Sequence, residues 1–114
     1  MSKDLSYLYT GTKGHIAAVA ISLPKTGAGL VARGWEEISH PMQAAAGAHT
    51  YREPSTGLRV RYDEPVPGAS GFAGKHHYHI LNPNATSSRD MYLDKDGNPC
   101  ARGSKESHIL PEGE

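Results

Sequence analysis

Three histidines lie within four positions of one another in the stretch GKHHYHILNP, residues 74–83. An imidazole has its ordinary pKa close to neutral pH, so it can give or take a proton under physiological conditions, and its neutral form binds metals. His77 and His79 are two positions apart, which in a strand places both rings on the same side of a sheet. The stretch raises three interpretations: acid–base catalysis, a metal site, or solvated histidines on the polar side of a strand.

The neighbouring segments add arginines to the same surface. LRVRYDE, residues 58–64, alternates apolar and charged side chains, which predicts a strand with one apolar and one charged face. HTYRE, residues 49–53, precedes it, and the turn signal PSTG joins the two. If these strands and HHYHIL (76–81) are neighbours, one exposed face carries a basic cluster, with Lys75 and His76 at its rim. The members of this cluster are Arg52, Arg59, Arg61, His77 and His79.

This set of side chains suits the cleavage of RNA without a metal. Of His77 and His79, one would be the general base on the ribose 2′-hydroxyl and the other would protonate the departing 5′-oxygen. Arginines bind phosphate through paired hydrogen bonds and offset the charge of the transition state, leaving a 2′,3′-cyclic phosphate product. We expect Arg59, Arg61 and a third histidine, His108 of KESHIL, in the catalytic group. The side chains expected to bind the substrate are Lys75, His76, Arg52 and Ser107.

The alternative is a nuclease that depends on a metal. His77 and His79, with His76 or His108, are able to ligate zinc through neutral imidazoles. Against this, the adjacent basic residues repel a dication, and no carboxylate lies close in the sequence. The acidic run LDKDGN, residues 93–98, lacks the later glutamate and the length of a calcium loop, and it is typical of a hairpin turn. We therefore predict neither a metal nor a cofactor.

The composition narrows the class of protein. The chain has 114 residues, which predicts one domain, and 37% of them are hydrophobic, which predicts a thin core. Twelve basic residues balance twelve acidic ones, so a nucleic-acid site would have to be a local basic patch. Cys100 is the only cysteine, which excludes an intrachain disulfide, a thiolate metal cluster and the cysteine pair of a deaminase. The apolar runs are too short to span a bilayer, so we expect no membrane span.

The order of the segments predicts an α+β fold. Residues 1–14 read as a polar lead-in, and a single domain is expected over residues 15–114. IAAVAISL, residues 16–23, favours a helix that Pro24 ends. The rest of the chain reads mostly as short strands, with a Pro/Gly-rich loop at 65–74 of the kind that often carries function. We expect an N-terminal helical segment followed by a four- to five-stranded antiparallel sheet.

Residues 34–111 also resemble the C-terminal toxin domains of bacterial polymorphic toxins of the Rhs and contact-dependent-inhibition types. The resemblance rests on WEEISHPMQAAAGAHTYREPSTGLRVRYDE, GASGFAGKHHYHILNPN, YLDKDGNP and GSKESHIL. It implies a small metal-independent ribonuclease with a fold of the barnase–EndoU–colicin–RelE type and an active site on the open sheet face. It also implies a larger secreted parent toxin that delivers the domain into the cytoplasm of a competing bacterium, and a cognate immunity protein that plugs the site.

The sequence departs from barnase because it has no clear glutamate base on its central strands. Glu64 stands at a strand end and could serve, which keeps the identity of the base open. Two interpretations without nuclease activity also remain. An ADP-ribosyltransferase toxin would use an arginine and a glutamate, such as Arg52 and Glu64, and a binding module would carry the histidines as ordinary surface residues.

Overall fold

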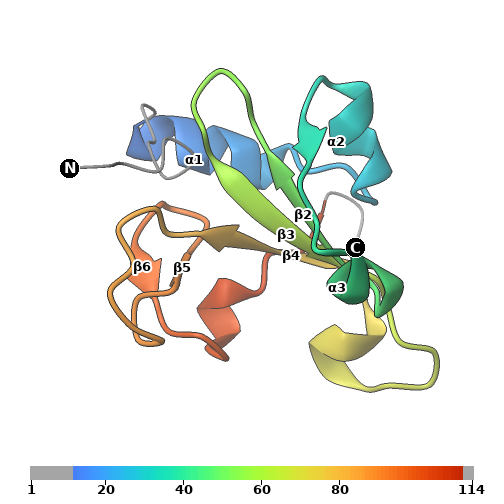
Figure 1. The fold of residues 1–114 in the computed structure, drawn as a ribbon. Helices are drawn as coiled ribbons and strands as arrows, with labels where there is room; N and C mark the ends of the chain where they lie inside the picture. The colour runs from blue at the N-terminus through green and yellow to red at the C-terminus, as the bar shows by residue number, and fades with distance from the viewer. Residues whose placement is uncertain (1–11, 112–114) are drawn as a thin grey trace.

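A computed structural model describes residues 12–111 of the chain (Figure 1). The strands and helices are short and alternate with many turns, as the glycine and proline content indicates. In chain order the elements are α1 (Lys13–Ile21), α2 (Ala28–Ala32), β1 (Glu36–Glu37), α3 (Pro41–Ala45), β2 (Ala48–Arg52), β3 (Arg59–Asp63), η2 (Gly71–Gly74), β4 (His77–Leu81), β5 (Tyr92–Leu93), β6 (Pro99–Cys100) and η3 (Lys105–Ser107).

All strands belong to one antiparallel sheet, in which each strand pairs with its neighbour in the sequence from β1 to β6. The predicted α+β fold, with a helical segment followed by an antiparallel sheet, is confirmed. The sheet has six strands, not the four or five expected. The difference comes from β1, β5 and β6, which have two residues each and are too short to leave an alternating pattern in the sequence.

Helix α1 begins close to the predicted position and for a recognisable reason. Thr12 is its N-cap, with a side-chain oxygen that accepts a hydrogen bond from the backbone N–H of His15. The helix ends at Ile21, two residues before the leucine that precedes Pro24, because a residue before proline disfavours helical geometry. Of the predicted lead-in, residues 1–11 lie outside the described residues.

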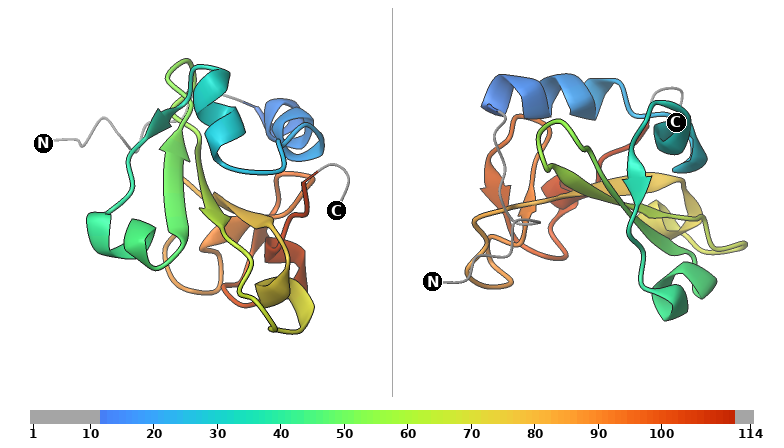
Figure 2. Two further views of the ribbon diagram at one scale, coloured as in Figure 1. Left: turned by 90° about the vertical axis from the view of Figure 1, so that its right-hand side faces the viewer. Right: turned by 45° about the horizontal axis from the view of Figure 1, so that its top comes forward.

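The core lies between the helices and one face of the sheet. Figures 1 and 2 show α1 and α2 on one side of β3 and β4, with η2 and η3 on the other side. Tyr78 on β4 is fully buried, and its hydroxyl donates a hydrogen bond to the carbonyl of Pro24, which ties the sheet to the end of α1. The buried cluster includes Ile16, Val19, Leu23, Leu30, Tyr51, Val60, Tyr62, Tyr78 and Ile80.

Strand register decides what the opposite face carries. Tyr62 pairs with Tyr78, and both face the core, so the residues on either side of them in the strands face away from it. The register sets Arg61 opposite His79 and Asp63 opposite His77. The expected alternation of LRVRYDE and HHYHIL is therefore confirmed. Within residues 12–111, no helix has both the length and the apolar character needed to cross a membrane.

Candidate active site

The two histidines of β4 are covered rather than open to solvent. His77 and His79 are each only 5% exposed, whereas the sequence predicted an exposed face. The prediction was wrong because it assumed that no other segment covers the charged face of the sheet. The loop with η2 brings Phe72 against His77, β5 stacks Tyr92 on His79, and the C-terminal segment brings in His108. The histidines thus sit at the back of a pocket.

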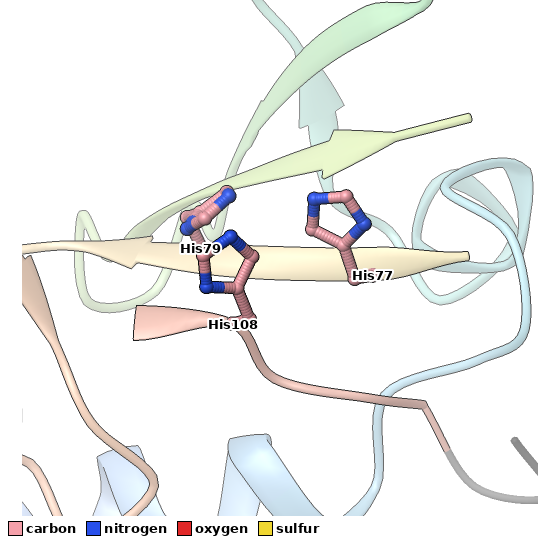
Figure 3. A group of neighbouring side chains, drawn as sticks. All are labelled: His77, His79 and His108. Atoms are coloured by element: carbon pink, nitrogen blue, oxygen red, sulfur yellow. The ribbon is translucent and has the colours of Figure 1, made fainter. Parts of the chain in front are cut away.

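Three imidazoles from distant parts of the chain come together there (Figure 3). The ring centroids are 5.2 Å apart for His77 and His79, 5.3 Å for His77 and His108, and 4.8 Å for His79 and His108. Ile109 exchanges two backbone hydrogen bonds with Tyr78, both 2.8 Å long, and this bridge holds the C-terminal segment beside β4. The structure therefore joins His108 to the pair, as the sequence suggested.

A carboxylate that the sequence reasoning overlooked completes the cluster. Oδ2 of Asp63 lies 3.1 Å from Nε2 of His77 and 3.6 Å from Nε2 of His79. Arg61 donates to both carboxylate oxygens, each at 2.7 Å, in the two-pronged geometry that makes such pairs strong. The signal was present, since Asp63 shares a strand face with Arg61, but its position opposite His77 depends on the register.

Hydrogen bonding indicates the protonation state of His77. Its Nδ1 lies 3.0 Å from the carbonyl of Lys75, and its Nε2 faces the carboxylate of Asp63. Both partners only accept hydrogen bonds, so the two contacts favour a proton on each ring nitrogen, which is the imidazolium form. Burial opposes this charge, but the hydrogen bonds to Asp63 and to the Lys75 carbonyl outweigh it and raise the pKa of His77.

The same cluster holds the carboxyl of Asp63 in its ionised form. Burial works against the charge, yet hydrogen bonds from the histidines and from Arg61, together with the Arg61 charge, hold the pKa of Asp63 well below its usual range. Asp63 is therefore an anion at every pH at which the protein would act. It supplies the negative charge that the imidazolium of His77 needs.

His79 is the neutral member of the group. Burial is the dominant influence and lowers the pKa of His79, despite the nearby carboxylate of Asp63. Its Nδ1 is buried and has no hydrogen-bond partner among the described residues. Tyr92 stacks on the ring with centroids 4.6 Å apart, and the Tyr92 hydroxyl accepts a 3.3 Å hydrogen bond from Arg61. His79 is therefore packed as an uncharged ring against both of the other imidazoles.

His108 is oriented by its backbone surroundings. Its Nδ1 donates to the carbonyl of Ser104 at 2.8 Å, which fixes the orientation of the ring and leaves Nε2 as the nitrogen that can exchange a proton. Phe72 stacks on the other side, with centroids 4.4 Å apart and an angle of 13° between the planes. Ser107, expected to bind substrate, is fully buried and donates to the same Ser104 carbonyl at 2.7 Å, so it shapes the turn that presents His108.

The imidazoles open onto a pocket of about 410 Å³. Two guanidinium groups line it, those of Arg61 and of Arg102, which the sequence reasoning did not single out. Arg102 is exposed and comes from the loop between β6 and η3. A pocket with two arginines and three imidazoles of different protonation states is suited to bind a phosphate ester and to move protons around it.

Four of the predicted site residues lie elsewhere. Arg52 and Arg59 face each other across β2 and β3, outside this pocket, and Arg52 forms an ion pair with Glu36. Lys75 contributes its backbone carbonyl, while its side chain is exposed and does not line the pocket. His76 points to the other side of the sheet, where its Nδ1 is hydrogen-bonded to the hydroxyl of Tyr62. The predicted basic surface is thus smaller and more enclosed than expected.

The same imidazoles are the best place for a metal ion. One nitrogen from each of His77, His79 and His108 lies within 4.8 Å of the others, and no further group of this kind occurs among residues 12–111. No carboxylate lies close to these histidines in the sequence, but strand pairing brings Asp63 alongside them. Tetrahedral zinc with bonds of 2.0–2.1 Å separates its ligand nitrogens by only about 3.4 Å, so the rings would have to move inward to bind it.

Comparison with known proteins adds no further assignment. The chain matches no protein-family model, and searches of curated proteins and of solved structures returned no significant match. The assignment of function rests on the geometry of the pocket and on the resemblance of its segments.

Proposed function

We propose that this chain is a ribonuclease that cleaves RNA by acid–base transphosphorylation without a metal. The observation that carries the proposal is the presence of two imidazoles with different surroundings on one pocket. His77 faces Asp63 and the Lys75 carbonyl, which favour its imidazolium form, whereas the Nδ1 of His108 is bonded to the Ser104 carbonyl, which leaves Nε2 to exchange a proton with substrate. A general acid and a general base are the two groups that this reaction requires.

In this proposal His108 accepts one proton and His77 donates another. Nε2 of His108 takes the proton of the ribose 2′-hydroxyl, and the resulting oxygen attacks the adjacent phosphorus. The bond from phosphorus to the 5′-oxygen breaks, and the proton on Nε2 of His77 passes to that oxygen. The products are a 2′,3′-cyclic phosphate and a 5′-hydroxyl, with His77 neutral and His108 charged until they exchange protons with water.

The hydrogen bond between His77 and Asp63 is suited to this role. Charged N–H to carboxylate bonds are usually about 2.7–2.9 Å long, and the 3.1 Å contact to Asp63 is longer than that. The proton on Nε2 therefore remains available to a second acceptor in the pocket. Arg61 and Arg102 bind the non-bridging oxygens and offset the charge that builds up on phosphorus.

The surrounding side chains position the proposed acid, His77, and the proposed base, His108. Asp63 holds both the imidazolium and Arg61, so it is a positioning residue. His79 lies beside both the acid and the base without adding charge, because a cation there would repel His77 and Arg61. Its aromatic contact with Tyr92 fixes the ring. These neighbours thus hold His77 and His108 in place on the pocket.

The biological setting follows from the resemblance to polymorphic toxin tips. In this proposal the domain belongs to a larger secreted toxin with a barnase–EndoU–colicin–RelE-type fold, and it acts in the cytoplasm of a competing bacterium. A cognate immunity protein protects the producing cell by covering the pocket. The helical segment followed by an antiparallel meander supports this placement, as does an active-site pocket on the sheet face away from the helices.

The test is cleavage of total bacterial RNA by the purified protein in excess EDTA. The unmodified protein should cut RNA and leave cyclic phosphate ends, and a His77→Ala/His108→Ala variant, folded by circular dichroism, should not. His49→Ala is the matched control, because His49 also binds carboxylates but lies on the other face of the sheet. Equal cutting by the double variant would overturn the proposal.

A second candidate function, a metal-dependent nuclease, is favoured by the convergence of three imidazole nitrogens. In that case His77, His79 and His108 would hold the ion, and the metal would activate water or stabilise the leaving oxygen. The same assay separates the two functions. Activity that EDTA abolishes and a divalent ion restores identifies the metal enzyme, whereas activity that persists in EDTA identifies the acid–base enzyme.

A further inference from the structure

A second, larger pocket lies on the far side of His108. It has a volume of about 760 Å³, and its floor is apolar, formed by side chains that include Ile21, Phe72 and Leu110. Ile21 is 76% exposed although it is a large aliphatic residue, so this floor is open to solvent. An exposed apolar floor beside a reactive group is typical of a binding site for a flat or apolar part of a ligand.

His108 belongs to both pockets and connects them. It stands between the phosphate-binding pocket and the apolar floor, and Phe72 is stacked on its ring. Any substrate group in the second pocket is therefore adjacent to the atom that takes the 2′-hydroxyl proton. The nucleotide that provides this hydroxyl is the one upstream of the bond that breaks, and its base is attached to the same ribose.

We propose that the second pocket, resting on the ribonuclease function above, binds the purine base of the nucleotide just upstream of the cleaved bond. The base lies on the apolar floor between Ile21 and Phe72, and its ribose points its 2′-hydroxyl at His108. The downstream nucleotide leaves from the side of His77 and Arg61. The pocket is thus a specificity subsite of the same reaction.

The chemistry of the pocket favours a purine. A two-ring base covers more of the apolar floor than a pyrimidine does, and it leaves less of the 760 Å³ unfilled. Charged side chains of both signs stand around the floor, among them Lys95, Lys105, Asp96 and Glu106. None of these four side chains forms a hydrogen bond or ion pair with another residue of the described chain. They remain available for the donors and acceptors on a purine edge.

The test is to sequence the cut ends of a random RNA pool treated with the protein. The expected result is an enrichment of A and G at the position upstream of the cut. Ile21→Trp fills the floor with an indole, and since Ile21 is exposed the change does not disturb the core. This variant should lose the purine preference, and its kcat/KM should fall roughly tenfold through KM, which corresponds to the loss of one stacked base.

Val31→Trp is the control, because Val31 is an exposed aliphatic residue on α2 that lines neither pocket. It should keep both the preference and the rate. No upstream preference in the unmodified protein, or a preference that survives Ile21→Trp, would overturn the subsite.

Binding of guanosine 3′-monophosphate distinguishes this inference from the ribonuclease function itself. If the protein cuts no RNA, saturable shifts of the methyl signals of Ile109 and Leu110 that Ile21→Trp abolishes would support the base site alone. The absence of both cleavage and binding would end both proposals. Cleavage without such binding and without purine preference would end only the base site.

Discussion

Two histidines on opposite faces of this sheet each contact a carboxylate, and they differ in what surrounds them. His49 on β2 faces the core side, where its Nδ1 lies 3.1 Å from Glu37 and its Nε2 lies 2.6 Å from Glu64. His77 on β4 faces the other side and contacts Asp63 at 3.1 Å. In both cases the carboxylate helps to raise the pKa of the imidazole. The raised pKa alone therefore does not distinguish a reactive histidine from a structural one.

The difference lies in the partners of each histidine and in the residues that line the pocket it faces. The side chain of Glu64 is 54% exposed, whereas that of Asp63 is 16% exposed and accepts hydrogen bonds from Arg61. His49 is bound tightly between two carboxylates, and its ring neighbours are tyrosines. His77 has a longer contact, two further imidazoles beside it and an arginine-lined pocket. We therefore expect acid–base catalysis from a histidine–carboxylate pair only where further imidazoles share its pocket.

Replacing each histidine in turn gives the largest expected effect. His77→Ala removes the proposed acid, and RNA cleavage in EDTA should fall by about 10²–10⁴-fold, the usual contribution of general acid–base catalysis. His49→Ala removes an imidazole that lies on the other face of the sheet and does not line the pocket, so the initial rate should stay unchanged. The measurement is the rate of cleavage of a fluorescent RNA oligonucleotide. Comparable losses in both variants would erase the distinction between the two faces.

The carboxylates provide the next comparison. Asp63→Asn should lower kcat/KM by about 10–100-fold, the range found when a group that orients a functional side chain is removed. It weakens the contacts that position both His77 and Arg61. The KM for RNA should therefore rise while kcat falls. Glu37→Gln alters a partner of His49 that does not line the pocket and should leave both constants unchanged. Circular dichroism at the assay temperature checks that each variant remains folded.

The pH profile sharpens the contrast within the pocket. The pKa of His77 is raised above 6.5, so the acid stays protonated to a higher pH than a free imidazole does. The alkaline limb of the kcat/KM profile should therefore lie above pH 6.5. In Asp63→Asn the carboxylate charge is lost while burial of His77 remains, and the alkaline limb should move toward acid. An alkaline limb at the same pH in Asp63→Asn would show that Asp63 does not raise the pKa of His77.

The strand pattern made a large part of the fold and of the site accessible from the sequence. Alternation in LRVRYDE and HHYHIL correctly placed Arg61, His77 and His79 on one face, because side-chain direction in a strand has a period of two. His108 was expected in the catalytic group, and the structure brings it there through the pairing of Ile109 with Tyr78.

Register and coverage were not accessible in the same way. Asp63 lies opposite His77 only because of how β3 pairs with β4, and no local pattern specifies this. The burial of the histidines depends on Phe72 and Tyr92, which reach the site from a loop and from a two-residue strand. Arg52 and Arg59 were assigned by face alone, and the distance along the strands puts them outside the pocket. The side of the sheet that a residue faces follows from the local sequence. Its position along that side depends on how the strands pair and on what covers them.

The smallest effect is expected for the stability contributed by His49. The hydrogen bond to Glu64 raises the pKa of His49 in the folded state above the ordinary 6.5, with burial opposing it. A raised folded pKa means that the stabilisation is fully present below pH 6.5 and is lost as pH rises through the folded pKa. Because Glu37 and Glu64 are substantially exposed, the pair contributes only about 0.5–1 kcal/mol.

His49→Gln should accordingly lower the free energy of unfolding at pH 6 by that amount and by less at pH 9, as measured by urea denaturation. Glu64→Gln provides the matched variant, and the two changes combined should cost less than the sum of the single ones, since both remove the same ion pair. A difference that is the same at both pH values would mean that His49 acts through packing rather than charge. The stability of this face would then depend on its aromatic contacts with Tyr51 and Tyr62, and the proton would matter only on the face that holds His77.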